Sequence, residues 1–159
     1  MSAAETVLVA ALELLGLNGS TGGPISLVEQ RPADVSPEAE AFVRRNPDTV
    51  FIISSTPLFR AALRAGRPDR DRPTFRLLAS VIAHERWHLE HGSDERGAYL
   101  MQLTTLLMLG AARDSFEYHR VTRAMLAVLA RAPRPRTTVA PPPTPVAPAS
   151  SNALHRVSR

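Results

Sequence analysis

The feature that most constrains the fold is a long helical hydrophobic pattern that is interrupted once, at Gly92. Over residues 74–91, apolar side chains recur about every three to four positions, which predicts an amphipathic helix with one buried face. Pro73 suits the start of that helix, and Gly92 is a typical stop signal. A second apolar helix is expected over about 94–109, with Ser93 as its N-cap. The pattern therefore predicts two long helices joined by a tight turn.

Shorter elements of both kinds surround this helical pair. Residues 49–53 are β-branched or aromatic throughout, which predicts a buried strand, and weak alternation predicts another over 25–29. Ser36 and Pro37 have the order of an N-cap and a first helical residue, which predicts a helix over about 36–45. Further helices are expected over 3–16, 56–65 and 115–130. We therefore expect an α+β domain that is mostly helical and contains a small β-sheet.

The charge distribution divides the chain into a neutral part and a basic end. The formal net charge is +4. Residues 132–159 account for all of it, because they hold no acid and four arginines: Arg134, Arg136, Arg156 and Arg159. A neutral remainder argues against a nucleic-acid-binding domain, which would concentrate basic charge on a folded face. The proline-rich composition after residue 131 predicts one domain over 1–131 and a disordered tail over 132–159.

Neither targeting nor membrane insertion is indicated. Residues 1–17 contain two acids and no basic residue, unlike a secretory signal peptide. No stretch approaches the ~20 apolar residues of a membrane span. A soluble, cytoplasmic protein is therefore expected. Cysteine is absent, so any protein-bound metal must be held by His, Asp or Glu.

The segment His84-Glu85-Arg86-Trp87-His88 combines two histidines four positions apart with a glutamate after the first. On a helix, four residues advance the chain by ~6 Å and ~400°, so both imidazoles leave the same face. They can then close on one zinc ion at ~2.0–2.1 Å. Glu85 is offset toward the flank, where it can reach a metal-bound water. The alternative is a surface helix on which two histidines align by chance.

A zinc centre also needs a third protein ligand, for which Glu95 is the favoured residue. On an uninterrupted helix Glu95 would rise ~10.5 Å beyond His88, but Gly92 allows the chain to reverse. Glu95 then lies in the first turn of the next helix. The alternative is an acid that only complements the N-terminus of that helix. His91 and Asp94 are the other nearby candidates.

Together, His84-Glu85-x-x-His88, Gly92 and Glu95-Arg96-Gly97-Ala98-Tyr99 resemble the gluzincin zinc metallopeptidases, in particular short bacterial members. The resemblance is specific over residues 81–102. It implies that His84, His88 and Glu95 bind Zn²⁺ and that Glu85 is the general base and acid. It also implies a zincin-like fold, with the strand near 49–55 forming a cleft wall to which an extended peptide adds. Thermolysin-like members place the glutamate much further downstream, so their substrate-binding parts cannot be transferred.

These features predict a zinc metallopeptidase that acts on a peptide or protein substrate. Tyr99 lies one turn after Glu95, so it can hydrogen-bond the oxyanion or the ligand carboxylate, or be an ordinary buried tyrosine. The rival from another class is a catalytically silent interaction module with a structural zinc. Hydrolysis of a non-peptide amide is a third interpretation. A catalytic zinc keeps an open, water-bearing position, whereas a structural one is closed, and this separates the first two.

Overall fold

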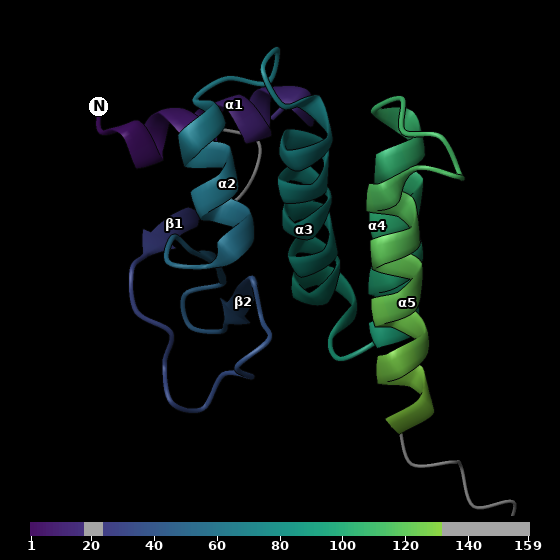
Figure 1. Ribbon diagram of the computed structural model, residues 1–159. Coiled ribbons are helices and arrows are strands. Elements are labelled where there is room, and N and C mark those ends of the chain that lie inside the picture. Colours follow the sequence, from purple (N-terminus) through teal and green to yellow (C-terminus); the bar gives the residue numbers. More distant parts are fainter. Residues whose placement is uncertain (18–23, 132–159) are drawn as a thin grey trace, which may run out of the picture.

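The computed structural model describes residues 1–17 and 24–131, so the tail expected over 132–159 lies outside the described residues. The described residues form five helices and one three-stranded sheet, which confirms the expected α+β class. In chain order the elements are α1 (Ala3–Leu14), β1 (Ile25–Val28), β2 (Ala41–Arg44), β3 (Thr49–Ile53), α2 (Pro57–Ala65), α3 (Arg72–His91), α4 (Glu95–Met108) and α5 (Phe116–Arg131). Helix α3 lies between the sheet with α1 and α2 on one side and the α4–α5 pair on the other (Figure 1). Within the described ranges, no helix has both the length and the apolar character needed to cross a bilayer.

β3 is the central strand of the sheet, with β1 parallel to it on one side and β2 antiparallel on the other. Its side chains Val50, Ile52 and Ile53 are fully buried, and this confirms the strand predicted over 49–53. The weaker prediction over 25–29 is also confirmed, as β1. Residues on both faces of β3 are buried, which explains why its sequence is apolar at nearly every position.

The helix predicted over 36–45 is wrong, because residues 41–44 form the edge strand β2. The helix-start signal at Ser36 produces only a turn, in which its carbonyl accepts the N–H of Ala39 at 3.0 Å. The chain then pairs with β3, and Phe42 stacks on Phe51 directly opposite with ring centroids 5.1 Å apart. Cross-strand packing of this kind outweighs a weak local helix preference.

α3 is the helix predicted over 74–91; it begins two residues earlier, at Arg72, and ends at Gly92 as predicted. The Asp71 side chain accepts the N–H of Thr74 at 3.2 Å, and Pro73 lies in the first turn, where no N–H partner is needed. Gly92 ends the helix at φ +69°, and its N–H donates to the carbonyl of His88. One face of α3 is fully buried in the core, through Phe75, Leu78 and Ile82 among others.

α4 begins one residue later than predicted, because its N-cap is Asp94 and not Ser93. The Asp94 carboxylate accepts the N–H of Gly97 at 3.0 Å, and Glu95 is the first helical residue. An aspartate at this position satisfies an unpaired N–H and also interacts favourably with the positive end of the helix. The turn at Gly92 folds α4 back along α3, so that the two helices form an antiparallel hairpin (Figure 1).

Gly97 lies where the first turn of α4 meets α3. A Cβ at Gly97 would come 2.7 Å from two ring carbons of Trp87 and would overlap the Asp94 carboxylate. We expect Gly97→Ala to lower the free energy of unfolding by about 1–3 kcal/mol, as overpacking does, although alanine is ordinarily the better helix former. Chemical denaturation of the two proteins measures this change. The neighbouring exposed substitution Arg96→Ala is the control, and a Gly97→Ala variant as stable as wild type would contradict the close approach.

α5 runs in the same direction as α3, because the chain reverses once between α3 and α4 and again between α4 and α5 (Figure 1). Near its start, the buried Glu117 carboxylate lies 3.5 Å from the Nε of Arg76. This pair places the beginning of α5 level with the beginning of α3. Later residues of α5 therefore run alongside the second half of α3.

Candidate metal centre

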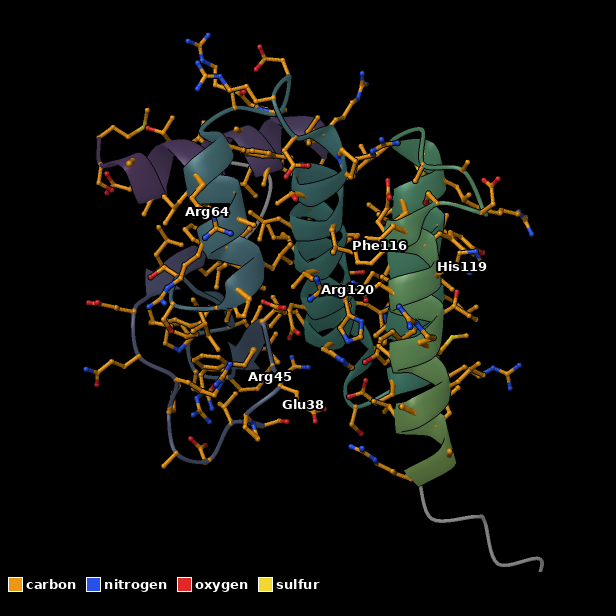
Figure 2. The ribbon with its side chains drawn as sticks, in the orientation of Figure 1. Glu38, Arg45, Arg64, Phe116, His119 and Arg120 are labelled. Atoms are coloured by element: carbon orange, nitrogen blue, oxygen red, sulfur yellow. The ribbon has the colours of Figure 1, made fainter. Side chains whose placement is uncertain are left out.

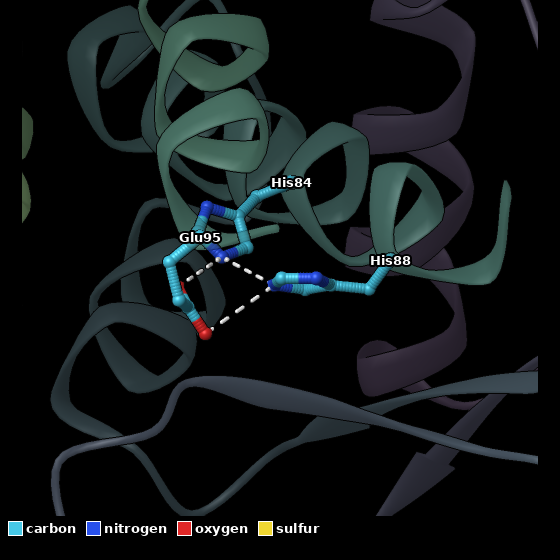
Figure 3. Close-up of side chains that lie close together, drawn as sticks. All are labelled: His84, His88 and Glu95. Atoms are coloured by element: carbon cyan, nitrogen blue, oxygen red, sulfur yellow. Dashed lines mark hydrogen bonds and ion pairs between the residues drawn. The ribbon is translucent and has the colours of Figure 1, made fainter. Parts of the chain in front are cut away.

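Three side chains from α3 and α4 meet at one point, as Figure 3 shows. The Nε2 atoms of His84 and His88 are 3.2 Å apart, as expected for histidines one turn apart on the same helix face. Oε2 of Glu95 lies 3.7 Å from Nε2 of His84, and Oε1 of Glu95 lies 3.6 Å from Nε2 of His88. The structure therefore brings together the three residues that the sequence indicates as ligands.

These separations fit a tetrahedral metal ion. Ligand atoms about 2.0–2.2 Å from one ion, at tetrahedral angles, lie about 3.4 Å from one another. The observed distances lie on either side of that value, the two from Glu95 being measured from different carboxylate oxygens, and one ligand atom from each residue lies within 4.8 Å of the other two. The donor set of two imidazoles and one carboxylate, without sulfur, is one that zinc accepts in proteins. The chemistry and proximity of the residues present therefore fit a zinc ion.

Three other possible ligands near the Gly92 turn do not face the two histidines. Asp94 is occupied as the N-cap of α4, and Glu90 is exposed. His91 is exposed and stacks flat against Trp87, with ring centroids 3.7 Å apart. Glu95 alone among these four residues turns toward the two histidines.

Hydrogen bonds at the far side of each ring hold the imidazoles in the orientation that a metal requires. Nδ1 of His88 lies 2.7 Å from the carbonyl oxygen of Gly92. Nδ1 of His84 lies 3.1 Å from Oε1 of Gln102, whose amide donates to Ser80. Since the Ser80 hydroxyl donates to the Leu77 carbonyl, it must accept from Gln102, and this fixes the amide orientation. Both Nδ1 atoms therefore carry the proton, and both Nε2 lone pairs face the centre.

Gln102 is a residue whose role the sequence did not reveal. Its amide oxygen bonds to Nδ1 of His84, which lies 18 residues earlier on the neighbouring helix. We expect Gln102→Leu to weaken zinc binding by about 10–100-fold, as loss of such an outer partner typically does. Competition with a zinc chelator measures the change. Thr104→Leu, an exposed position on the same helix, should leave the affinity unaltered; equal losses in both variants would contradict the assigned role.

Glu85 and Tyr99 complete the polar surroundings of the centre. Burial, and then the charge of Glu95, raise the pKa of Glu85 to about 8, whereas burial and then the charge of His88 lower the pKa of His84 to about 4. His84 is therefore neutral at pH 7 and ready to bind a metal, whose positive charge would favour the ionised form of Glu85. Burial and the charge of Glu95 raise the pKa of Tyr99, so its hydroxyl stays protonated.

Tyr99 also packs against the metal-facing surface. Its ring meets the His84 ring edge-on, with centroids 4.6 Å apart. No hydrogen bond links its hydroxyl to Glu95 within the described part of the chain, although both side chains line the same cavity. Tyr99 therefore packs against His84 and lines the cavity together with Glu95.

A cleft of about 570 Å³ opens over the centre. One wall is the chain from Asp34 to Arg44, which includes β2. The opposite side is formed by α3, α4 and α5, through side chains that include Leu77, Val81, His84, Glu85, His88, Glu95, Tyr99, Gln102, Arg120 and Val121. The sequence-based expectation placed the strand at 49–55 in this wall. β3 instead lies behind β2 as the central strand, and β2 occupies the edge that faces the cleft.

Arg45 links this wall of the cleft to α3, the helix that carries His84 and His88. Its guanidinium donates to the carbonyl oxygen of His88 at 2.8 Å, across 43 residues of sequence. It adds a second donor to a carbonyl that already accepts the N–H of Gly92, and it holds the β2–β3 turn beside the histidines. No local pattern in the sequence signals this contact.

Comparison with known proteins does not assign this chain to a family. No protein-family model, curated protein or solved structure matches the chain.

Proposed function

We propose that this protein is a zinc-dependent hydrolase that cleaves peptide bonds. The observation that carries the proposal is the convergence of His84, His88 and Glu95 at the floor of an open cleft, with Glu85 beside them. A zinc ion held there would polarise a carbonyl and lower the pKa of a bound water from ~15.7 toward ~7. The chain's own residues supply the remaining chemistry.

Glu85 is the proposed proton carrier. It follows His84 on α3, is partly buried and lines the same cleft as the three candidate ligands. As a carboxylate it accepts a proton from the attacking water, and as the acid it returns that proton to the leaving amine. Tyr99, protonated and packed against His84, is the proposed hydrogen-bond donor to the developing oxyanion.

The β2 edge supports a peptide as the substrate. The Glu40 carbonyl accepts the N–H of Ile53 at 3.1 Å, and inward and outward groups alternate along an antiparallel strand. The N–H and C=O groups of Ala41 and Val43 therefore point away from β3. Within the described residues, no hydrogen bond uses these outward groups. An extended peptide can pair with them while its scissile bond lies over the centre.

The rival is an interaction module that uses zinc only for structure. Structural zinc sites are closed by four protein ligands, whereas catalytic sites keep a position open. Among the residues that the structure describes, three donor side chains gather here, and the Glu95 side chain is 45% exposed toward the cleft. These two observations favour the catalytic interpretation.

Elemental analysis of the purified full-length protein, combined with digestion of a broad peptide library, tests the proposal. We expect about one zinc per chain and reproducible cleavage products, both lost in a His84→Ala/His88→Ala variant. Protein that holds zinc yet cleaves no peptide would favour the silent module. Protein that binds neither zinc nor another divalent metal would contradict the metal centre.

A further inference from the structure

Arg120 and Glu40 form a charged pair at one end of the cleft. Nη2 of Arg120, on α5, donates to Oε1 of Glu40 at 2.8 Å, and this links α5 to the chain just before β2 across 80 residues of sequence. Arg120, Leu58 and Leu77 line the main cleft and also border a second, smaller hollow beside Phe116. The shared residues therefore mark the end of the cleft, and Figure 2 shows Arg120 reaching from α5 toward α3.

Arg120 has more N–H donors than its bond to Glu40 uses. A guanidinium carries five N–H donors, and among the described residues the bond to Glu40 is the one that Arg120 makes. Its side chain is 40% exposed, so it is open to the cleft that it lines. Arg44, the other arginine lining the cleft, is instead held by two bonds to Asp34, of 2.7 and 2.8 Å. Arg120 is thus the cation in this cleft that is available to an anionic ligand.

The surface between Arg120 and the metal centre is largely apolar. Leu77 and Val81 on α3 and Val121 on α5 line this part of the cleft. Since Glu117 lies level with Arg76 and the two helices run in the same direction, Arg120 is roughly 8 Å short of His84 along the helix axes. An extended peptide covers that length with about two residues.

We propose that Arg120 binds a substrate carboxylate about two residues from the scissile bond. The carboxylate is either the free C-terminus of a peptide or an acidic side chain at that position. Glu40 orients the guanidinium without using all its donors, and the apolar walls accept the intervening side chains. Because a planar guanidinium can bind a carboxylate through two parallel hydrogen bonds, Arg120 determines specificity as well as affinity. This inference rests on the proposed function.

Binding of short hydroxamate peptides to the zinc-loaded full-length protein tests the proposal. Each probe carries a zinc-binding hydroxamate followed by two apolar residues, and it ends in a free carboxylate or in a carboxamide. A third probe ends in a carboxamide and carries a glutamate side chain. A fourth probe carries a lysine side chain in place of that glutamate. We expect the free acid or the glutamate probe to bind at least tenfold more tightly than the plain carboxamide, and which of the two does so identifies the source of the carboxylate.

Variants of Arg120 and of a control arginine test whether Arg120 causes the preference for a carboxylate. Arg120→Gln should abolish it while the zinc content stays unchanged, Arg120→Lys should retain part of it, and Arg123→Gln, an exposed arginine of α5, should leave it intact. Equal binding of all four hydroxamates, tightest binding of the lysine probe, or a preference that survives Arg120→Gln would overturn the assignment of Arg120 and leave the hydrolase proposal standing. Failure of every hydroxamate to bind would overturn the metal centre and this inference with it.

Discussion

Replacing Glu85 with glutamine is expected to leave zinc bound and to slow peptide hydrolysis by about 10²–10⁴-fold, the usual contribution of general acid–base catalysis. Glutamine has nearly the same shape but cannot accept a proton from the attacking water. Glu85 contributes no atom to the three-ligand group, so the metal affinity should be unaffected. Zinc content by elemental analysis and turnover of one defined peptide measure the two effects separately.

The matched control is Glu90→Gln, which makes the same change at an exposed position on the same helix. It should retain wild-type turnover. A Glu85→Gln protein that cleaves the peptide as fast as wild type would rule out the proposed proton transfer. Loss of zinc from that variant would instead mean that Glu85 helps to hold the metal.

Removal of the Glu95 carboxylate is expected to have the second large effect, a loss of at least tenfold in zinc affinity for Glu95→Ala. A site with only two imidazoles is left with an incomplete donor set, since catalytic zinc sites use three protein ligands. Competition with a chelator measures the affinity. The helix itself should remain folded, because its N-cap is Asp94 and not Glu95.

Asp94 and His91 provide the controls for that prediction. Asp94→Asn keeps a side chain that can cap α4, and His91→Ala removes an exposed ring that stacks on Trp87. Both should leave the zinc affinity little changed; Asp94→Ala should also spare it, at a cost of about 1 kcal/mol in stability through the lost cap. If Asp94→Ala removes the metal and Glu95→Ala does not, the third ligand is Asp94 and the glutamate assignment is wrong.

The histidine pair could be predicted from the sequence because its geometry is local. Two residues four positions apart on a helix share a face whatever surrounds them, and the pattern around His84 and His88 predicts that helix clearly. Gly92 is equally local, since its positive φ is a conformation that other residues rarely adopt. Together these features also indicated that Glu95 would return toward the histidines.

The strand β2 shows where local reasoning fails. Ser36 and Pro37 signal the start of a helix, and the chain does turn there, but residues 41–44 then pair with β3. Strand pairing depends on a partner that the local sequence does not specify, so an edge strand of four residues carries little signal of its own. The error also misplaced the cleft wall, because the strand that faces the cleft is the one that was expected to be a helix.

The sequence by itself determined the five observed helices, the break at Gly92 and the set of three candidate ligands, since each depends mainly on interactions within a few residues along the chain. Only the tertiary structure decided what surrounds them. Gln102 reaches His84 across 18 residues, Arg45 reaches His88 across 43, and Arg120 reaches Glu40 across 80. These contacts form because packed helices and a sheet bring distant residues together, and no spacing in the sequence encodes such a meeting.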